Sequence, residues 1–344
     1  MPKVSIIILV YNIEKYIEKC ARSLFQQTLD DLEYIFVNDC TPDNSINVIQ
    51  DVLKDYPSRK NQVKIVNLEI NSGQAAARKR GVLEATGEFV IFCDGDDWVD
   101  KNMYQRLYDC AIQHNYDIVR CLFRRVSEGH QKLCKLIPLE SYANKKQLLS
   151  YLIRSSDFSS TCDKLVRRNV VFSQKFVYPK DNMCEDLVYV LQYVLNAKSI
   201  GYINESFYYY RQNESSISHV LETEHICRKA LQISNNVELL QAILAKANLK
   251  TNFKGEIVAA KYMAKDSFRP IIGRNGMYEK WKSCFSEINS KILFNKYLSV
   301  KQKLIFLICL LGLYPFIKRY IEDSYEDHYY YIVGGITFVI LCLA

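Results

Sequence analysis

The chain has 344 residues, of which 49% are hydrophobic and 24% are charged, and its formal net charge is +7. This composition excludes an intrinsically disordered protein, and the length favours one large core with an appended region. Its 12 cysteines are scattered singly without a CxxC pair, which excludes a small disulfide scaffold and is typical of a reducing cytosol.

The first 100 residues alternate short apolar runs with amphipathic helical patterns. The runs are VSIIILV, LEYIFVN, VKIVNL and EFVIFC, and the segments between them place apolar residues at helical spacing. Strands joined by single helices predict a parallel sheet with right-handed crossovers. Strands that are apolar throughout predict helices on both faces of that sheet. We therefore expect a Rossmann-like α/β fold with a mostly parallel sheet flanked by helices.

Polar residues follow each of these predicted strands. Tyr11 follows the first strand, Asp39 the second and Gly73 the third, and the acidic run DGDD, residues 94–97, ends the fourth. Ligands of open α/β sheets bind at the carboxyl ends of the strands. The chain has neither a GxGxxG after its first strand nor a GxxxxGK, so the usual dinucleotide and P-loop cradles are absent. The pattern indicates a nucleotide site of another kind.

The acidic run itself calls for a positive partner. Asp94, Asp96 and Asp97 stand where a buried strand stops, although like charges at this spacing repel and are costly to bury. Mg²⁺ prefers oxygen ligands and is commonly held by one or two carboxylates plus substrate phosphates. A helix cap by Asp97 or Asp100 is the alternative, but capping does not require so many acids. We therefore predict a metal-diphosphate site.

After residue 100 the pattern is less regular. It predicts a helix near 101–113, the strand IVRCLF, a loop to about 143, helices around 146–154 and 185–195, and the aromatic strand YINESFYYYR. Residues 222–290 are predicted to be mostly helical, with breaks near Pro270 and Gly273.

The C-terminal part is basic and then apolar. From Lys246 to Lys303 there are 13 Lys and Arg against 4 Asp and Glu, a charge that suits nucleic acid, anionic lipid, a phosphorylated substrate or simply a solvated helical face. Two apolar runs follow, 304–317 and 329–344, and both are shorter than the ~20 residues of a spanning helix. We expect a peripheral contact with the inner face of a membrane and no nucleic-acid partner. A membrane-embedded transporter is excluded.

Four motifs together resemble one enzyme family. VSIIILVYN, VNDCTPDNS, NSGQAAARKRG and FCDGDDW, in this order and at these spacings, resemble the inverting family 2 glycosyltransferases with the GT-A fold, of the bacterial polysaccharide or lipid-linked glycan type. The resemblance is strong over residues 3–100 and moderate over 160–219. It implies a nucleotide-diphospho-sugar donor, usually used together with Mg²⁺ or Mn²⁺.

The resemblance also implies roles for residues at the strand ends. Tyr11 would lie against the base ring and Asp39 would hydrogen-bond the base. Asp94 and Asp96 would form the metal and ribose site, with Asp97 beside them. The chemistry agrees, because an aromatic face stacks on a base and a carboxylate accepts an imide or amino proton. Taken singly, Tyr11 is more often a core residue, and Asp39 could simply start a turn.

Further residues are candidates for the nucleotide and its phosphates. Arg78 is placed to reach them, and Gly73 lets the start of its helix approach closely. Similar family segments are implied to bring Arg211 and His219 to the diphosphate. The family usually has ARN where this chain has Ala77, Arg78 and Lys79, so no role is carried over for the missing asparagine.

An acidic pair is the candidate for acid–base chemistry. In the family a comparable ED pair opens a helix that faces the sugar, which makes Asp186 the implied base and Glu185 its neighbour. The alternative is ordinary enrichment of acids in a first helical turn. Asp163 and Lys164 lie in a segment that resembles the acceptor side. The QxxRW motif of processive polymerases is absent, so we expect transfer of one sugar per encounter.

The sequence thus predicts a metal-dependent inverting glycosyltransferase with a nucleotide-sugar donor, a uridine one, and a glycan or lipid-linked acceptor in cell-surface polysaccharide synthesis. Two alternatives stay open: a sugar nucleotidyltransferase, which would carry a basic Gly-rich loop where this chain has YNIE, and a non-catalytic, membrane-associated module that binds nucleotide-sugar or glycan. The predicted parts are a catalytic domain 1–220 with a nucleotide-sugar half 1–100 and an acceptor half 101–220, a basic helical extension 221–300, and an apolar membrane-associating tail 301–344.

Overall fold

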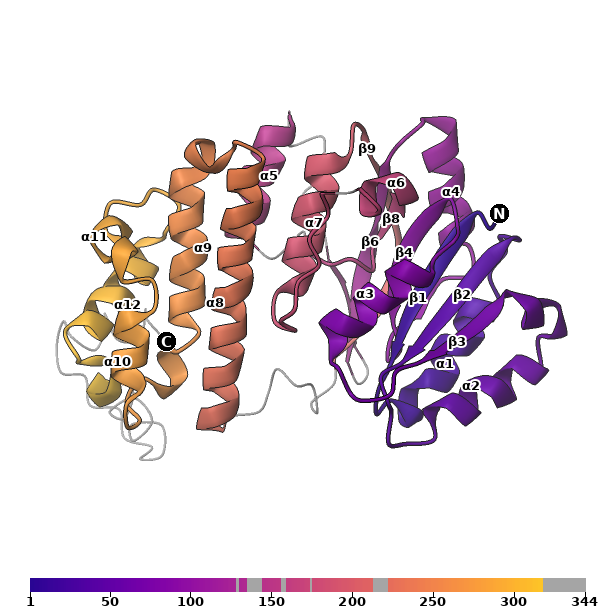
Figure 1. Cartoon of the computed structure of the whole chain (residues 1–344), viewed down its shortest axis with the longest axis horizontal. Coiled ribbons are helices and arrows are strands. Elements are labelled where there is room, and N and C mark those ends of the chain that lie inside the picture. The colour runs from indigo at the N-terminus through magenta and orange to yellow at the C-terminus, as the bar shows by residue number, and fades with distance from the viewer. Residues whose placement is uncertain (128–129, 135–143, 156–158, 174, 213–221, 318–344) are drawn as a thin grey trace. The chain divides into compact units, whose positions relative to one another are not determined.

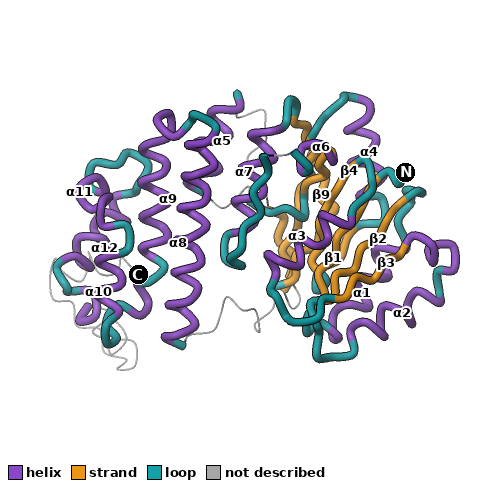
Figure 2. The backbone as a smooth tube through the Cα atoms, in the orientation of Figure 1, coloured by secondary structure: helices purple, strands orange, loops and turns teal. Residues whose placement is uncertain are grey.

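The structure is a computed structural model that describes residues 1–127, 130–134, 144–155, 159–173, 175–212 and 222–317 (Figure 1). Contacts within the chain divide it into two compact units, Met1–Ile217 and Ser218–Ala344. The first contains a mixed sheet with flanking helices, and is called the sheet unit below. The second is helical where it is described, and is called the helical unit (Figure 2).

The first half of the sheet unit has the alternating pattern that the sequence predicts. Its elements are β1 Val4–Val10, α1 Glu14–Phe25, β2 Leu32–Asn38, α2 Ser45–Lys54, the 3₁₀ helix η1 Pro57–Gln62, β3 Val63–Asn67, α3 Gln74–Glu84 and β4 Phe89–Asp94. β1 pairs in parallel with β2 and β4, and β2 pairs in parallel with β3. The order β3-β2-β1-β4 reverses direction after β3, so right-handed crossovers place α1 and α2 on one face and α3 on the other (Figure 1).

The second half extends the same sheet with mixed strand directions. Its elements are β5 Trp98–Val99, α4 Met103–Gln113, β6 Ile118–Ser127, β7 His130–Cys134, α5 Lys145–Arg154, β8 Lys164–Arg167, α6 Arg168–Val171, α7 Glu185–Asn196 and β9 Ile200–Arg211. The sheet continues from β4 through β8, β6 and β9 to β5. β8 is antiparallel to both β4 and β6, whereas β6 and β9 are parallel to each other.

The sequence did not predict three short strands, β5, β7 and β8. The loop predicted up to residue 143 is wrong at His130–Cys134, where β7 forms an antiparallel hairpin with β6. This strand, HQKLC, has no buried side chain and therefore no apolar pattern by which to recognise it. β5 and β8 have only two and four residues, too few for any periodicity to be visible.

The core of the sheet unit sits at β1, β2 and β4, whose apolar side chains are almost all inaccessible to solvent. The predicted coverage of both faces is therefore confirmed for these strands. α3 lies very close to the sheet, because a Cβ at Gly81 would be 2.3 Å from Ile7 and 3.1 Å from Val37. Because Gly81 has no side chain, α3 can approach this closely, and the approach sets the distance between α3 and the sheet.

The helical unit packs around one tryptophan. Its elements are α8 Thr223–Lys246, η5 Lys250–Phe253, α9 Lys254–Asp266, η6 Arg269–Ile271, α10 Met277–Ser283, η7 Ser286–Ile288, α11 Asn289–Ile292 and α12 Val300–Leu310. This confirms the predicted helical content and the break near Pro270. Trp281 is fully buried and its ring contacts Tyr278 and Phe306 at centroid distances of 6.0 and 5.9 Å.

The apolar run 304–317 is only partly buried. α12 begins with a capping box between Ser299 and Gln302, and its Phe306 also contacts Tyr262 at 6.4 Å. Among the helices that the structure describes, none combines the length and apolar character that a membrane crossing requires. The second predicted apolar run, 329–344, lies outside the described residues.

Candidate active site

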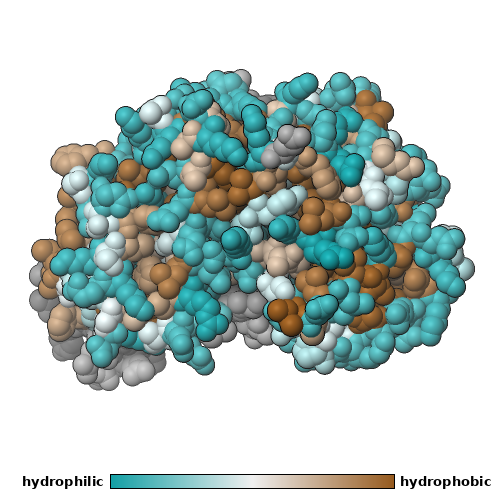
Figure 3. All heavy atoms as spheres, in the orientation of Figure 1, coloured by the Kyte–Doolittle hydropathy of each residue, from teal (hydrophilic) through white to brown (hydrophobic). Residues whose placement is uncertain are grey.

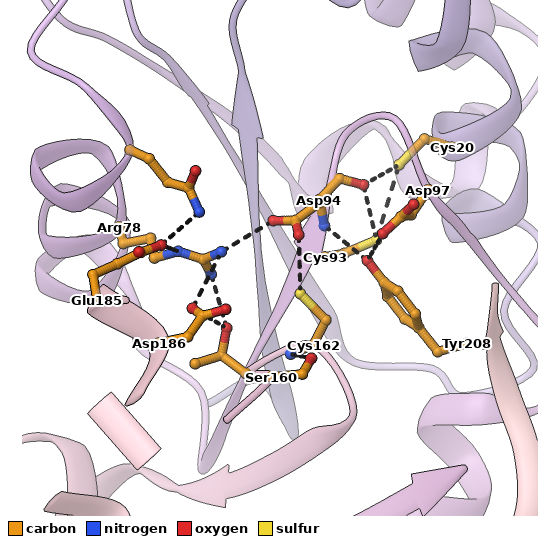
Figure 4. Close-up of polar contacts among 12 residues, drawn as sticks. Cys20, Arg78, Cys93, Asp94, Asp97, Ser160, Cys162, Glu185, Asp186 and Tyr208 are labelled. Carbon is orange, nitrogen blue, oxygen red and sulfur yellow. Dashed lines mark hydrogen bonds and ion pairs between the residues drawn. The ribbon is translucent and has the colours of Figure 1, made fainter. Parts of the chain in front are cut away.

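Arg78 is the centre of the polar cluster at the strand ends (Figure 4). Its side chain is fully buried on α3, and its guanidinium lies 4.8 Å from the centre of the Phe92 ring. Nη2 is 3.2 Å from Oδ1 of Asp94 and 3.5 Å from Oδ1 of Asp186, and Nε is 3.4 Å from Oε1 of Glu185. Long-range packing thus brings the acidic run after β4 and the acidic pair of α7 to one arginine.

The cluster holds more negative than positive charge. One guanidinium faces the three carboxylates of Asp94, Glu185 and Asp186. This excess of negative charge favours the protonated form of the least solvated carboxylate. Burial, reinforced by the charge of Asp186, raises the pKa of Glu185 to about 8. Burial also raises the pKa of Asp186, against the opposing effect of Arg78. Burial alone would lower the pKa of Arg78, but the acids outweigh it and raise that pKa well above its usual value.

The two members of the acidic pair have different surroundings. Glu185 has 5% of its side chain exposed and accepts a hydrogen bond from Nε2 of Gln74 at 2.6 Å. Asp186 has 29% of its side chain exposed. Its Oδ1 accepts a hydrogen bond of 3.2 Å from the hydroxyl of Thr161, which itself accepts one of 2.9 Å from Nη1 of Arg78. Only Asp186 is therefore open to a substrate hydroxyl.

The carboxylates of the acidic run also differ in their surroundings. Asp97 is buried, and its two oxygens accept hydrogen bonds from the Tyr208 hydroxyl at 2.5 Å and the backbone N–H of Arg211 at 2.7 Å. Burial, together with the charges of Asp96 and Asp94, raises its pKa well above the usual range. Asp94 keeps 32% of its side chain exposed.

The expected metal site is not assembled from three carboxylates. Within the part of the chain that the structure describes, no group of three or more His, Cys, Asp or Glu side chains is placed to hold a metal ion. Both oxygens of Asp97 are already engaged, which fits a structural role in the loop. Asp94 and the half-buried Asp96 carry the oxygen donors that a hard divalent cation requires and are partly exposed, although Arg78 and Cys162 already contact the two oxygens of Asp94.

Asp39 and Gly73 build the loop that starts α3. The two carboxylate oxygens of Asp39 accept hydrogen bonds from the backbone N–H groups of Ser72 at 2.7 Å and Gly73 at 2.9 Å. Gly73 has φ of +83°, and a Cβ there would be 2.4 Å from the Asn182 amide. Asn182 in turn accepts a hydrogen bond from the N–H of Ala75 at 2.9 Å. The glycine is thus required by both conformation and space.

Tyr11 and Arg211 lie at the predicted strand ends. Tyr11 directly follows β1 and is 44% exposed, which leaves its ring available to a ligand. Arg211 ends β9, its Nε donates to the backbone oxygen of Asp96 at 2.9 Å, and its guanidinium lies 4.9 Å from the Tyr16 ring centre. Their roles toward base and diphosphate remain predictions. His219 lies outside the described residues.

Buried charged side chains support the segment that resembles the acceptor side. Asp163 and Lys164 are both fully buried, so neither side chain is open to an acceptor. Nζ of Lys164 is 2.6 Å from Oδ1 of Asp163 and donates to the backbone oxygen of Ser160 at 2.6 Å, and Arg120 lies 3.3 Å from Oδ2 of Asp163. This group supports the turn that presents Thr161 to the site.

Sequence reasoning missed several residues of this site, namely Gln74, Thr161, Cys162, Asn182 and Tyr208. Cys162 places its thiol 3.5 Å from Oδ2 of Asp94, and Thr161 precedes it in the segment SSTCDK. Their types are common in loops and their partners are distant in sequence, so no local pattern marks them. The proximity of this segment to the acidic run in space is the only signal, and it requires the fold.

Several known proteins are similar to this chain in sequence. The family "Glycosyl transferase family 2" matches residues 5–171. The uncharacterized glycosyltransferase EpsJ of Bacillus subtilis is 32% identical over 228 residues, which is 64% of each chain. The poly(ribitol-phosphate) beta-N-acetylglucosaminyltransferase TarS of Staphylococcus aureus is 26% identical over 266 residues, or 75% of this chain and 43% of TarS. The chain thus spans less than two thirds of the length of these curated relatives.

Solved structures share the fold. Residues 1–349 of S. aureus TarS in complex with UDP-GlcNAc match with a TM-score of 0.55 at 19% identity, over 97% of this chain and 95% of that one. The mannosyltransferase PcManGT of Pyrobaculum calidifontis, in complex with GDP-Man and Mn²⁺, matches with a TM-score of 0.52 at 12% identity, over 91% and 87%. At these identities the likeness establishes the architecture alone.

Proposed function

We propose that the chain, whose residues 5–171 match the glycosyl transferase family 2 model, transfers one sugar at a time, with inversion, from a nucleotide-diphospho-sugar to a glycan or lipid-linked acceptor. The proposed donor is a uridine one. Support for a nucleotide-sugar comes from the relatives named above, one of which was solved with UDP-GlcNAc.

One observation carries the proposal: buried Arg78 holds Asp94 and Asp186 on the same guanidinium, with about a third of each carboxylate exposed. The first is the last residue of β4, at the edge of the sheet where ligands of such folds bind. The second begins α7. A donor on the β4 side and an acceptor hydroxyl on the α7 side would therefore meet over one preorganised group of charges.

The proposed reaction uses Asp186 as the general base. Its carboxylate takes the proton of the acceptor hydroxyl, the acceptor oxygen bonds to the anomeric carbon, and the bond from that carbon to the nucleoside diphosphate breaks on the opposite side. Burial raises the pKa of Asp186 above the ordinary aspartate value, which makes it a better proton acceptor. In this scheme Glu185 carries a proton, so it positions Arg78 and does not accept the proton of the acceptor hydroxyl.

Tyr11, Asp39 and Gly73 are proposed to form the nucleotide pocket, and Arg211 to neutralise part of the diphosphate. Asp39 would act chiefly through the loop that its oxygens hold, with the base approaching from the exposed side of Tyr11. Arg78 would act by orienting the carboxylates with which it pairs, because its guanidinium is fully buried.

Asp94 and Asp96 are proposed to hold Mg²⁺ or Mn²⁺. Both offer hard oxygen donors at the strand end, and Asp97 supports the loop from inside. A divalent cation bound there supplies positive charge against the leaving diphosphate. Asp94→Asn and Asp96→Asn should each remove the metal dependence of donor binding, whereas Asp51→Asn on the exposed face of α2 should not. Near-normal rates for either variant in millimolar Mg²⁺ or Mn²⁺ would remove that residue from the site.

A donor screen tests the function as a whole. The full chain is mixed with UDP-, GDP- and other nucleotide-sugars with and without Mn²⁺, and thermal stabilisation and release of nucleoside diphosphate are measured. We expect stabilisation and slow hydrolysis with a UDP-sugar. Release of pyrophosphate from a nucleoside triphosphate and a sugar phosphate would instead identify a nucleotidyltransferase. Binding without turnover in the presence of any acceptor would identify a non-catalytic module.

We further propose that the enzyme works in cell-surface polysaccharide synthesis at the cytoplasmic face of the membrane. After the buried residues of α12 the chain exposes apolar side chains, with 69% of Leu311 and 73% of Phe316 accessible. Lys301 and Lys303 lie on the same helix and suit anionic head groups. In the view of Figure 3, hydrophilic residues predominate and hydrophobic ones gather in patches among them.

Point variants test the membrane contact better than truncation, because Phe306 belongs to the packed core of the helical unit. Leu311→Glu with Phe316→Glu should reduce binding to phosphatidylglycerol vesicles without changing the melting temperature. Leu231→Glu, an exposed leucine of α8, serves as the control. A wild-type chain that ignores such vesicles at low salt would contradict the proposal.

A further inference from the structure

A basic hollow on the sheet unit lies outside the candidate active site. It has a volume of about 550 Å³ and runs along α1 to β5. Four cations line it, Lys15, Lys19, Arg22 and Lys101, together with Trp98 and the single acid Glu18. The cations of α1 are spaced so that they share one side of the helix.

Three of the four cations lack a carboxylate partner. Arg22 pairs with Glu18 and Asp55, at 2.9 Å from each, so these charges are satisfied among themselves. No acid within the described parts of the chain forms an ion pair with Lys15, Lys19 or Lys101. The hollow therefore carries uncompensated positive charge, which attracts an anion and holds it more strongly at low salt.

The aromatic wall of the hollow connects it to the candidate active site. Trp98 stacks on Tyr209 with centroids 5.4 Å apart, and Lys19 lies 3.2 Å over the Trp98 ring. Arg211 lies 5.0 Å from the same ring centre while its Nε donates to the backbone oxygen of Asp96. Arg211 thus contacts both the wall of the hollow at Trp98 and the acidic run at Asp96, two residues earlier in the sequence.

We propose that this hollow binds a phosphate group carried by the acceptor. Three ammonium groups around one hollow match the charge and the several acceptor oxygens of a phosphate, whereas a neutral glycan would leave their charge uncompensated. The phosphate belongs either to a polyol-phosphate polymer or to a lipid-linked acceptor. The assignment of this phosphate to an acceptor rests on the proposed function, but binding of phosphate itself does not.

Binding is measured first, on the full chain at low salt. Inorganic phosphate, glycerophosphoglycerol and phosphatidylglycerol vesicles are titrated against wild type and against the double variant Lys15→Gln with Lys101→Gln. Each lost charge should weaken binding by about fivefold at low ionic strength, and added salt should reduce the difference. Lys60→Gln, an exposed lysine of η1 outside the hollow, should bind as the wild type does.

The outcomes separate the sources of the phosphate. Binding of the soluble diester that the double variant loses assigns the hollow to a polymeric acceptor, and vesicle binding that the double variant loses, without binding of the diester, assigns it to a lipid-linked one. Absence of binding for all three probes, or equal binding by the double variant, overturns the proposal.

Turnover separates the proposal from the proposed function. The double variant should hydrolyse the donor at the wild-type rate and show a raised KM only for acceptors that carry phosphate. A raised KM for neutral acceptors as well would contradict a phosphate site. A chain that binds phosphate in the hollow but hydrolyses no nucleotide-sugar would refute the proposed function and leave the anion site standing.

Discussion

Two of the buried cations, one in each unit, have different roles. Arg78 in the sheet unit and Lys265 in the helical unit are both completely inaccessible to solvent. Arg78 is surrounded by carboxylates that are partly exposed. Lys265 instead donates to the backbone oxygens of Trp281, Lys282 and Cys284, at 2.6, 3.1 and 2.7 Å, where the chain leaves α10.

The pKa values follow from these surroundings. Neighbouring acids raise the pKa of Arg78 despite its burial, whereas burial lowers the pKa of Lys265 to about 8. A charge held by ionisable groups that reach solvent can support proton transfer and ligand binding. A charge held by backbone oxygens fixes a chain turn and does no chemistry. Burial of a charge alone therefore does not identify an active site.

Removal of Arg78 should have the largest effect. Arg78→Met leaves three carboxylates without their cation, so we expect a free energy of unfolding lower by about 3–5 kcal/mol at neutral pH. Transfer should fall by about 10²–10³-fold or more in whatever fraction remains folded. Arg80→Met, which removes an exposed arginine of the same helix, should cost less than about 0.5 kcal/mol. Chemical denaturation and single-turnover assays measure both quantities.

Removal of Lys265 should affect stability without affecting chemistry. Lys265→Met leaves the three backbone oxygens without their donor, at a cost of about 2–4 kcal/mol in the free energy of unfolding. The transfer rate per folded molecule should stay at the wild-type value, and Lys254→Met at the exposed start of α9 should change neither. A large loss of transfer in stably folded Lys265→Met would erase the distinction drawn between the two cations.

Glu185→Gln should change how stability depends on pH. The folded-state pKa of Glu185 is raised to about 8 from an ordinary 4.5, so its contribution to stability is fully present below pH 4.5 and is lost as pH rises through about 8. The glutamine variant lacks this loss, and its stability relative to wild type should increase by on the order of 4 kcal/mol between pH 5 and 9. Glu69→Gln on the surface is the control, and a parallel pH profile for Glu185→Gln would show that Glu185 is ionised in the fold.

Thr161→Val should have the smallest effect. Loss of the hydrogen bond to Asp186 removes a stabilising donor from its ionised form, which raises the pKa of Asp186. The acidic limb of the transfer rate should move to higher pH, with a loss of about threefold to tenfold at neutral pH. Thr161→Ser keeps the hydroxyl and should restore the wild-type profile. A uniform loss at all pH values, without a moved limb, would mean that Thr161 does not act through Asp186.

The first 100 residues could be read from sequence because their signals are local. The apolar strands β1, β2 and β4 and the helical spacing between them predict the sheet, and the topology then predicts which ends meet. β8 could not be predicted in this way, because the four residues KLVR become a strand only through pairing with β4 and β6.

Within the site, residue types were predictable and their roles were not. Asp94 and Asp97 belong to one acidic run, yet the hydroxyl of Tyr208, a residue 111 positions from Asp97, donates to the carboxylate of Asp97 and accepts from the backbone N–H of Asp94. Glu185 and Asp186 are adjacent in sequence, but successive helical residues point in different directions, so one is buried and the other is open. Neither difference is visible without the tertiary contacts.

The most direct test of the account compares Asp186→Asn with Glu185→Gln in a single-turnover assay with saturating donor. Asp186→Asn should bind the donor with nearly unchanged affinity and lower the rate of transfer by about 10²–10⁴-fold, the usual contribution of a positioned base. Glu185→Gln should keep the rate within about threefold of wild type, because the glutamine resembles the protonated acid. A large rate loss in Glu185→Gln with a near-normal Asp186→Asn would contradict the assignment of the base.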